Sequence, residues 1–436
     1  MESLTLGLAA IAMLLVFGGI GVPIGVSMIA VAVAGFTLFM DLSFSLTMVR
    51  TLPWSTLSQY SFVVIPMFIL MGNYAAAGGI IREMFHTANA WTSGVRGGLY
   101  LAVTMASAGF AAVSGSTIVN AAVFTKVALP EMLSRNYNKR ISGACIAAAG
   151  TFAALIPPSI AMAIYGLLTD ESIGQLLIAG LIPGLLTVLV YSLLIIILVR
   201  IKPDLAPLAT ERIRLGEKMR SLKGSWAIML LIFIIIGGMY GGYISPSSAG
   251  SVGALGALAI SVARRRIAVA QVRTALADAA QLGTVIFLIL IGGLMFSRLL
   301  LITGFVDDLT EFFLDIGVTP MRFIIGVVVL YAILGMFMEA LSMMVVTVPF
   351  LFPIAKNMGV DPVWFGVLVV KLSELAVISP PVGINLFTVV GASDGVVKMK
   401  DIYKGIIPFV FAEFIVIALL IMYPSLSTWL PATMRG

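Results

Sequence analysis

Two double prolines, each inside an apolar segment, constrain the fold of this chain more than any other feature. Pro157-Pro158 and Pro380-Pro381 interrupt runs long enough to cross a lipid bilayer. Proline lacks a backbone donor and clashes with the preceding turn, so a helix should break at each pair. Irregular backbone survives inside a membrane only where it is buried in protein or lines a polar cavity. The sequence therefore predicts two broken helices near a protected site.

The proline pairs also indicate an internal duplication. They lie 223 residues apart, and the same offset relates Pro130 to Pro353 and Pro23 to Pro246. A shared offset at several landmarks is typical of a repeat. Paired broken helices in two repeats are the best sequence indication of a transporter binding site.

The composition excludes several protein classes. Of the 436 residues, 60% are hydrophobic and 11% are charged, and the mean hydropathy is +1.12, so we expect an all-α polytopic membrane protein rather than a soluble domain. The only cysteine, Cys145, excludes a disulfide framework or a cysteine metal site. The sequence has no P-loop, histidine-rich metal site or nucleophile elbow, so we expect no enzyme activity, no catalytic residue, no cofactor and no metal beyond sodium. The first apolar run, 4–39, lacks the pattern of a cleaved signal peptide.

Hydropathy divides the chain into two similar halves. The first half predicts scaffold helices over 1–60, a span with an interfacial arm over 61–98, a hairpin and a broken helix over 99–168, and a span over 169–200. The first piece of the broken helix should run from Ile141 to Ile156, and the span from Ser172 to Val199. A basic linker over 201–224 follows. The second half predicts scaffold helices over 225–263, a span from Leu282 to Thr303 with an arm over 264–320, a hairpin and a broken helix over 321–392, and a last span over 393–436.

Short apolar helices around small or polar joints predict two re-entrant hairpins. The first has its tip at Ser114-Gly115-Ser116, and the second at Glu339-Ala340-Leu341-Ser342. For the first hairpin, the alternative is a single helix with a flexible Ser-Gly-Ser stretch. Basic segments at 200–223, 264–273 and 398–404 should be cytoplasmic, and the acidic segment 304–320 should lie outside. The halves then have inverted topology, the hairpins enter from opposite sides, and both termini lie outside.

This arrangement brings polar groups and helix ends together near the middle of the membrane. Helix N-termini suit an anionic substrate, whereas helix C-termini, unwound carbonyls and hydroxyls suit Na⁺. The predicted sodium-binding residues are Ser114, Gly115, Ser116, Gly150, Thr151, Gly335, Glu339, Ser342, Ser373 and Asn385. The predicted substrate-binding residues are Ser116, Pro157, Pro158, Ser159, Pro380, Pro381 and Gly383.

Alternatives remain open for individual side chains. Any one serine could instead bond back to its own helix. Glu339, which matches Ser116 in the repeat, is a candidate ion ligand or proton site, because a membrane-embedded acid is costly. Its alternative is pairing with a nearby cation or access to an aqueous cleft. The sequence assigns no role to Glu374, which matches Thr151, nor to the embedded cations Lys126, Arg298 and Lys371.

The chain resembles the large membrane subunit of tripartite ATP-independent periplasmic (TRAP) transporters. The resemblance rests on four stretches: Gly109 to Ser116 with Pro130, Ala148 to Ser159, Gly335 to Glu339 with Pro349 and Pro353, and Pro380 to Asn385. It implies an elevator-type carrier, similar to the ion-transporter superfamily, in the bacterial inner membrane. It also implies Na⁺ coupling, a separate small four-helix membrane subunit, and a periplasmic substrate-binding protein. The implied substrate is an organic acid such as a C4-dicarboxylate or sialic acid.

Two other functions compete with this interpretation. One is a stand-alone Na⁺/dicarboxylate carrier of similar architecture, which would need no binding protein. The other is a channel or structural membrane protein, which would show no coupled Na⁺ flux. The sequence does not identify the substrate, because in such systems a binding protein makes the first selection.

Overall fold

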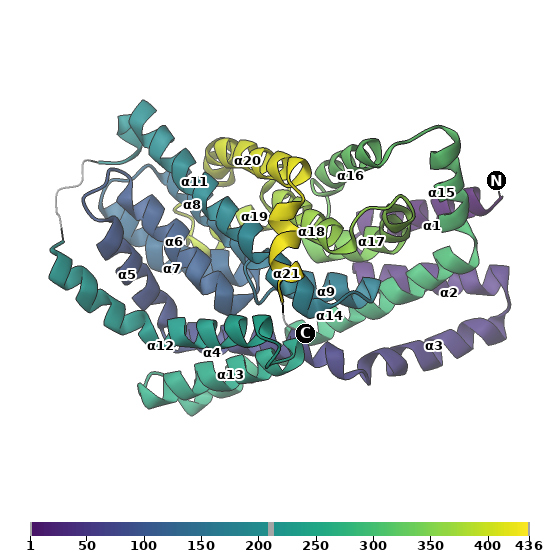
Figure 1. Ribbon diagram of the computed structural model, residues 1–436, viewed down its shortest axis with the longest axis horizontal. Helices are drawn as coiled ribbons and strands as arrows, with labels where there is room; N and C mark the ends of the chain where they lie inside the picture. Colours follow the sequence, from purple (N-terminus) through teal and green to yellow (C-terminus); the bar gives the residue numbers. More distant parts are fainter. Residues whose placement is uncertain (1, 208–212, 435–436) are drawn as a thin grey trace.

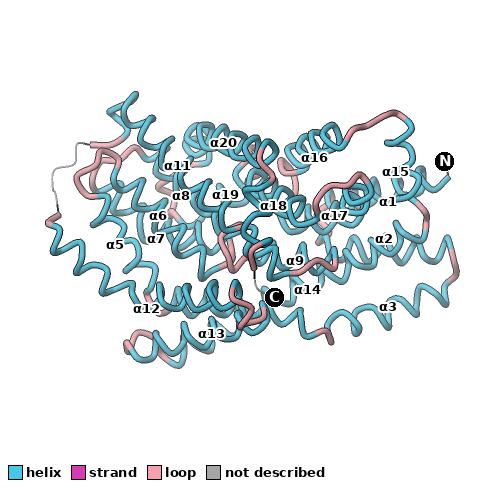
Figure 2. Tube along the Cα trace, viewed as in Figure 1, coloured by secondary structure: helices cyan, strands magenta, loops and turns pink. Residues whose placement is uncertain are grey.

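The computed structural model describes residues 2–207 and 213–434. These residues form helices joined by short turns, with no strand among them (Figures 1 and 2). Within the described residues, six helices are long and apolar enough to cross a membrane. The predicted all-α, multi-pass class is therefore confirmed.

The first half contains fourteen of the helical elements in chain order. They are α1 Glu2–Gly19, α2 Ile24–Phe39, α3 Leu42–Leu57, η1 Tyr60–Val63, α4 Val64–Ala77, α5 Ile80–Thr92, α6 Gly98–Ser114, α7 Thr117–Ser134, α8 Lys139–Gly150, η2 Thr151–Ala154, α9 Ile160–Thr169, α10 Ile173–Ala179, α11 Leu181–Ile201 and η3 Pro203–Leu205.

The second half follows a parallel order. Its helices are α12 Leu215–Tyr240, α13 Pro246–Ala263, α14 Val269–Ile302, α15 Phe305–Asp315, α16 Pro320–Leu334, α17 Ala340–Asn357, α18 Pro362–Ile378, α19 Ile384–Ala392, α20 Met399–Met422 and α21 Ser425–Ala432.

Both predicted helix breaks are present. The first proline pair lies between η2 and α9, and the second lies between α18 and α19. Each pair is joined by a cis peptide bond. The expected α-helix up to Ile156 was too long, because it ends at Gly150 and a tighter 3₁₀ turn follows. The Thr151 hydroxyl donates to the Ala148 carbonyl at 2.8 Å in this turn.

The two predicted hairpins correspond to the pairs α6–α7 and α16–α17. The first joint, at Gly115 and Ser116, agrees with the prediction. The second joint spans 335–339, so the predicted tip was misplaced toward the C-terminus. Ser342 lies inside the first turn of α17 because the Glu339 side chain caps this helix by accepting from the Ser342 backbone N–H. Ser116 caps α7 in the same way through the Val119 N–H.

Several other boundaries differ from the sequence prediction. Residues 42–57, within the predicted scaffold helices over 1–60, form a separate helix α3 although many of them are polar. Helix α12 begins inside the predicted linker, part of which (208–212) lies outside the described residues. The long α14 begins at Val269 instead of Leu282. The predicted span from Ser172 to Val199 is present as one apolar segment, Ile173–Ile201, with a turn at Gly180 between α10 and α11, where an added Cβ would lie 2.3 Å from the Leu155 carbonyl oxygen. The short helix α21 was not predicted.

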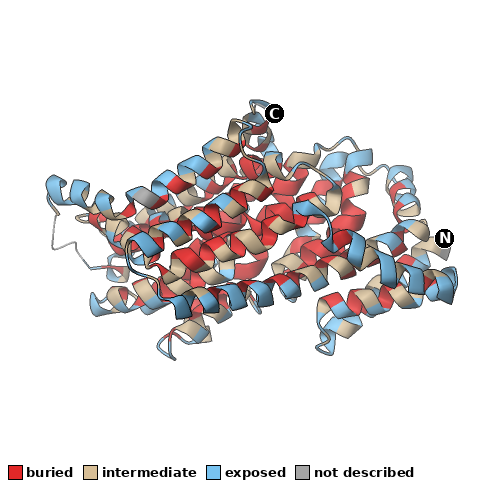
Figure 3. Cartoon of the chain, turned by 90° about the horizontal axis from the view of Figure 1, so that it is seen from below, coloured by how far each residue is buried: buried red, intermediate tan, exposed pale blue. Residues whose placement is uncertain are grey.

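The main packing contacts cross between the halves. Helix α2 packs against α14, and α4 packs against α13. Glycine permits the closest approach: a Cβ at Gly292 of α14 would lie 2.5 Å from the Gly25 carbonyl oxygen of α2. Small residues allow helix backbones to approach in this way in membranes. Buried residues concentrate along the middle of the molecule, and exposed ones lie toward its edges (Figure 3).

Candidate functional site

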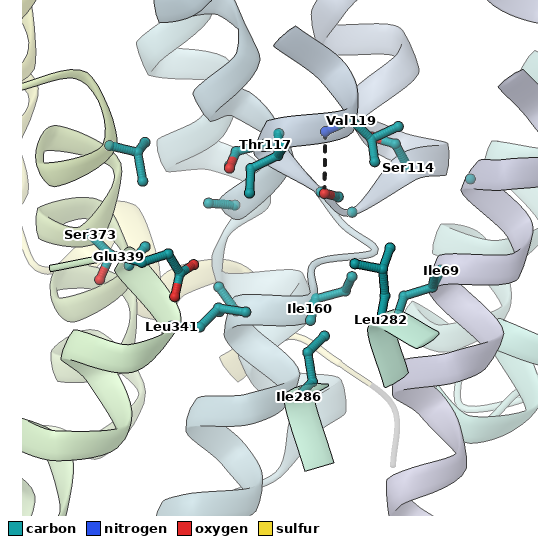
Figure 4. Close-up of a pocket in the computed structure, with 18 of the residues that line it drawn as sticks. Ile69, Ser114, Thr117, Val119, Ile160, Leu282, Ile286, Glu339, Leu341 and Ser373 are labelled. Atoms are coloured by element: carbon teal, nitrogen blue, oxygen red, sulfur yellow. Dashed lines mark hydrogen bonds between the residues drawn. The ribbon is translucent and has the colours of Figure 1, made fainter. Parts of the chain in front are cut away.

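A cavity of about 310 Å³ lies where both hairpins meet the first broken helix and α18. The turn between α6 and α7 forms one side of it, and the turn before α17 forms another. Helices α4 and α14 supply apolar walls that include Ile69, Leu282 and Ile286 (Figure 4). Its size is at the lower end for small-molecule sites, and apolar walls with a few polar groups are typical of them.

The first hairpin tip is fixed against the first broken helix. Gly115 has a φ of +58°, and an added Cβ would lie 2.9 Å from the Pro158 carbonyl oxygen. The Gly115 carbonyl accepts from the Ile160 N–H at 3.5 Å. Glycine is required here because other residues rarely adopt this backbone conformation. The turn is thereby held at the N-terminus of α9.

The serines beside Gly115 behave differently. Ser116 accepts from the Val119 N–H at 3.4 Å, which satisfies one free donor of α7. Ser114 is buried, and its hydroxyl has no hydrogen-bond partner among the described residues. Both serines line the cavity, as does Gly115. A buried hydroxyl without a partner is rare, and one that faces a cavity is available to a ligand.

The second hairpin tip presents a carboxylate. Glu339 Oε2 accepts from both the backbone N–H and the hydroxyl of Ser342, at 3.0 and 3.2 Å. The tip is held against α18, because a Cβ on Gly335 would lie 2.4 Å from the Ala376 Cβ. Figure 4 shows Glu339 beside Ser373 and across the cavity from Ser114 and Thr117. The two tips thus contribute oxygen atoms from opposite sides.

Helix α18 completes this side of the cavity. Ser373, Glu374 and Val377 line it. The Ser373 hydroxyl donates to the Val369 carbonyl at 3.0 Å, so its oxygen can still accept or coordinate. No lysine or arginine is among the described residues that line the cavity, whereas two carboxylates are. A cation would therefore be favoured in the cavity as it stands.

The structure brings together six of the predicted sodium-binding residues. These are Ser114, Gly115, Ser116, Glu339, Ser342 and Ser373. The others lie behind or beside the cavity: Gly150 and Thr151 are buried at the end of α8, Gly335 packs on α18, and Asn385 donates to the Ala147 carbonyl at 3.1 Å. The Asn385 side-chain oxygen is buried without a hydrogen-bond partner among the described residues.

Of the predicted substrate-binding residues, Ser116 alone is in the lining of this cavity. Ser159 caps α9 by accepting from the Met162 N–H at 3.2 Å, and it donates to the Ala154 carbonyl. The lining does not include Pro157, Pro158, Ser159, Pro380, Pro381 or Gly383. The breaks therefore position the neighbouring helix ends instead of facing the cavity themselves. Their predicted contacts with substrate stay predictions.

Other lining residues were not predicted. Asn73 and Thr117 contribute polar groups, and Ile69, Ile160 and Ile286 contribute apolar ones. Thr117 follows the hairpin tip directly, so its position could have been inferred. The contributions of α4 and α14 depend on packing between distant segments and leave no local signal.

The three embedded cations differ in exposure. Lys126 and Arg298 are exposed, whereas Lys371 is completely buried in α18. Its ammonium contacts Glu374 Oε2 at 2.6 Å and Glu413 Oε2 at 2.5 Å, and it donates to Thr187 Oγ1 at 2.9 Å. Of the predicted embedded cations, Lys371 is therefore the one held in an ion-paired cluster.

Comparison with known proteins gives a consistent result over nearly the whole chain. A family model described as "Tripartite ATP-independent periplasmic transporter, DctM component" matches residues 11–426. The chain is 30% identical to the C4-dicarboxylate TRAP transporter large permease protein DctM of Vibrio cholerae, over 96% of this chain and 95% of that protein. It is 28% identical to the sialic acid TRAP transporter large permease protein SiaM of the same organism, over 95% and 96% of the two chains.

The solved structure of the YdaH transporter of Alcanivorax borkumensis has a similar fold. The TM-score is 0.60 at 13% sequence identity, covering 89% of this chain and 90% of that one. At this identity the likeness concerns the fold alone.

Proposed function

We infer a transport function from one premise: the chain belongs to the DctM component family of tripartite ATP-independent periplasmic transporters. Its homologues are transporter permeases and not enzymes. We propose that it is the transport subunit of a Na⁺-coupled importer of an organic acid, of the C4-dicarboxylate or sialic acid type. A periplasmic binding protein would deliver the acid, and a separate small membrane subunit would complete the complex in the inner membrane.

The observation that carries the proposal is the cavity between the two hairpin tips. It is lined by Ser114, Ser116, Ser342, Ser373 and Glu339, which are hard oxygen donors of the kind that Na⁺ prefers. Bound Na⁺ ions would offset the carboxylate charge. An organic anion could then bind next to them and to the N–H groups at the start of α7 and α17. Cation and anion binding would thus be coupled through charge.

An inverted repeat and an elevator motion form part of the same proposal. Exchanged packing of α2 with α14 and of α4 with α13 supports an inverted repeat, since corresponding helices make reciprocal contacts. The paired helices α1–α2 and α12–α13, here called the frame, would stay with the small subunit. The hairpins and broken helices, here called the carrier, would move as one body. Helices α5 and α15 would connect the two.

Reconstitution of the purified complex in liposomes tests the function. Uptake of radiolabelled succinate or sialic acid should require an inward Na⁺ gradient, the small subunit and a loaded binding protein. Uptake that needs no binding protein would instead identify a stand-alone Na⁺/dicarboxylate carrier. Downhill flux of the acid without any Na⁺ movement would contradict a coupled carrier and favour a channel.

A further inference from the structure

One carboxylate oxygen of the carrier, on Glu374, makes none of the contacts described above. Glu374 lies on α18 and is 1% exposed. Its Oε1 is buried without a hydrogen-bond partner among the described residues. The residue also lines the cavity between the hairpins. A buried carboxylate oxygen without a hydrogen-bond partner is strongly unfavourable. Because this one belongs to a residue that lines a cavity, we expect a ligand in the cavity to bind it.

The other carboxylate oxygens of the same cluster contact neighbouring groups, although Glu413 Oε2 makes an ion pair with Lys371 without a hydrogen bond. Glu374 Oε2 and Glu413 Oε2 both contact the Lys371 ammonium. Glu413 Oε1 accepts from the Tyr191 hydroxyl. The lysine also donates to Thr187. Helices α11, α18 and α20 therefore hold Glu374 through its Oε2, whereas Oε1 has no hydrogen-bond partner among the described residues and the residue lines the cavity.

The charges in this cluster do not balance. Two carboxylates, Glu374 and Glu413, share one ammonium, and both glutamates and Lys371 are fully or almost fully buried. In a low-dielectric interior an uncompensated charge costs several kcal/mol or more, so a counter-ion is favoured at the free oxygen. The Lys371 ammonium already contacts Glu374 Oε2, so we expect an additional cation at Oε1 of this cavity-lining residue.

The second hairpin brings further oxygen donors to that side. Gly335 packs on Ala376, two residues beyond Glu374, and the cavity lining includes Glu339 and Ser342 from the hairpin and Ser373 from α18. Two carboxylates and two hydroxyls thus surround one part of the cavity. Carboxylate and hydroxyl oxygens are hard donors, which suit hard cations such as Na⁺.

We propose that Glu374 supplies a direct carboxylate ligand to the cation site at the second hairpin, together with Glu339, Ser342 and Ser373. This rests on the proposed Na⁺-coupled function and names a ligand for it. The Lys371–Glu413 pair holds the other Glu374 oxygen and leaves Oε1 for the ion. The cation site then joins the hairpin tip to α18, so that binding of Na⁺ closes the tip on the rest of the carrier.

Sodium-dependent melting of the purified protein tests this assignment without any organic substrate. The melting temperature is measured in lipid nanodiscs while NaCl replaces choline chloride at constant ionic strength. The wild-type protein should be stabilised by Na⁺. The Na⁺ concentration that gives half of the shift should rise about tenfold or more in Glu374→Gln, as expected when a metal site loses a necessary group.

Two further variants keep the test decisive. Glu374→Asp keeps the charge but withdraws the carboxylate by one methylene, so it should fold and also require more Na⁺ for half of the shift. Glu131→Gln removes a surface carboxylate that pairs with Arg135 at 2.8 Å and should leave the Na⁺ requirement unchanged.

The outcomes separate this inference from the proposed function. Wild-type stabilisation by Na⁺ with an unchanged half-saturating concentration in both Glu374 variants would overturn the ligand assignment alone. An absence of Na⁺ stabilisation in the wild type, together with uptake that does not depend on Na⁺, would overturn the proposed function. Stabilisation by KCl equal to that by NaCl, each in place of choline chloride, would also contradict a Na⁺ site at these residues.

Discussion

At the scale of single residues, two serine hydroxyls of the hairpins lie in the lining of the cavity. Ser116 lines the cavity and caps α7, and Ser342 lines it while bonding to Glu339. We expect Ser116→Ala or Ser342→Ala to lower the apparent Na⁺ affinity of uptake more than it lowers the amount of protein in the membrane. The Na⁺ dependence of initial uptake rates, with immunoblots for protein amount, measures both. An unchanged Na⁺ dependence in both variants would remove these serines from the site.

Gly115 provides a second prediction at this scale. Its φ of +58° and its closeness to the Pro158 carbonyl oxygen both oppose a side chain. Gly115→Ala should therefore destabilise the folded protein by about 1–2 kcal/mol from the backbone conformation alone and displace the tip. The melting temperature and the Na⁺ affinity should both fall.

Gly326→Ala is the matched control for Gly115→Ala. Gly326 lies within α16, and an added Cβ there meets no atom within 4 Å. The control should be neutral or stabilising by up to about 1 kcal/mol, because alanine favours helix. Equal behaviour of the two variants would show that the tip tolerates a side chain.

Residues differ in how far the sequence could predict them. The proline breaks were predictable because proline acts on its own helix. The tip of the second hairpin was predicted at 339–342, whereas the joint between the helices is 335–339. In sequence, a glutamate that caps a helix cannot be distinguished from a residue within a loop. Glu374 was noticed as the match of Thr151, but its free oxygen depends on Lys371 and Glu413. Such a relation among buried side chains has no local sequence pattern.

At the scale of helices, close packing is clearest between α2 and α14. A leucine at Gly292 would bring side-chain atoms into the α2 backbone at Gly25. Gly292→Leu should destabilise the protein by about 1–3 kcal/mol, as expected for overpacking, and lower the melting temperature. Gly237→Leu on α12 should not, because an added Cβ there meets no atom within 4 Å. A similar loss in both variants would mean that the leucine itself, and not the contact, is harmful.

The sequence predicted apolar helices better than polar ones. Helix α3 falls within the predicted scaffold helices over 1–60, but its own bounds could not be predicted because Ser43, Thr47, Arg50 and Thr51 interrupt its apolar residues. Helix α14 was predicted from its apolar second half alone, since Arg273 and Asp278 mark its beginning as polar. The α14 wall of the cavity could not be predicted, because it arises from packing against distant segments.

At the scale of the whole molecule, the predicted motion can be tested at a second cavity. This cavity of about 630 Å³ lies between the frame helices α1–α2 and the second hairpin, and Leu15 and Phe337 both line it. Cysteines at these two positions, in a Cys145→Ala background, could be joined by a cleavable bifunctional thiol reagent. The linked protein should lose uptake and regain it under reductant, because the hairpin would be tied to the frame.

Each single-cysteine variant, treated with the same reagent, controls for simple modification. Full uptake by protein whose cross-linking is verified on a gel would show that the hairpin does not travel relative to α1. The test therefore separates a moving carrier from a fixed site with moving gates.

The exchanged pairing of α2 with α14 and α4 with α13 also has a consequence for biosynthesis. The first half leaves the ribosome long before its packing partners are made, so α2 and α4 first lie in the bilayer without the helices α14 and α13 that cover them in the folded protein. Each half produced alone should fail to fold and be degraded. The same halves, produced together from two separate genes, should associate in the membrane and restore the function of the intact protein.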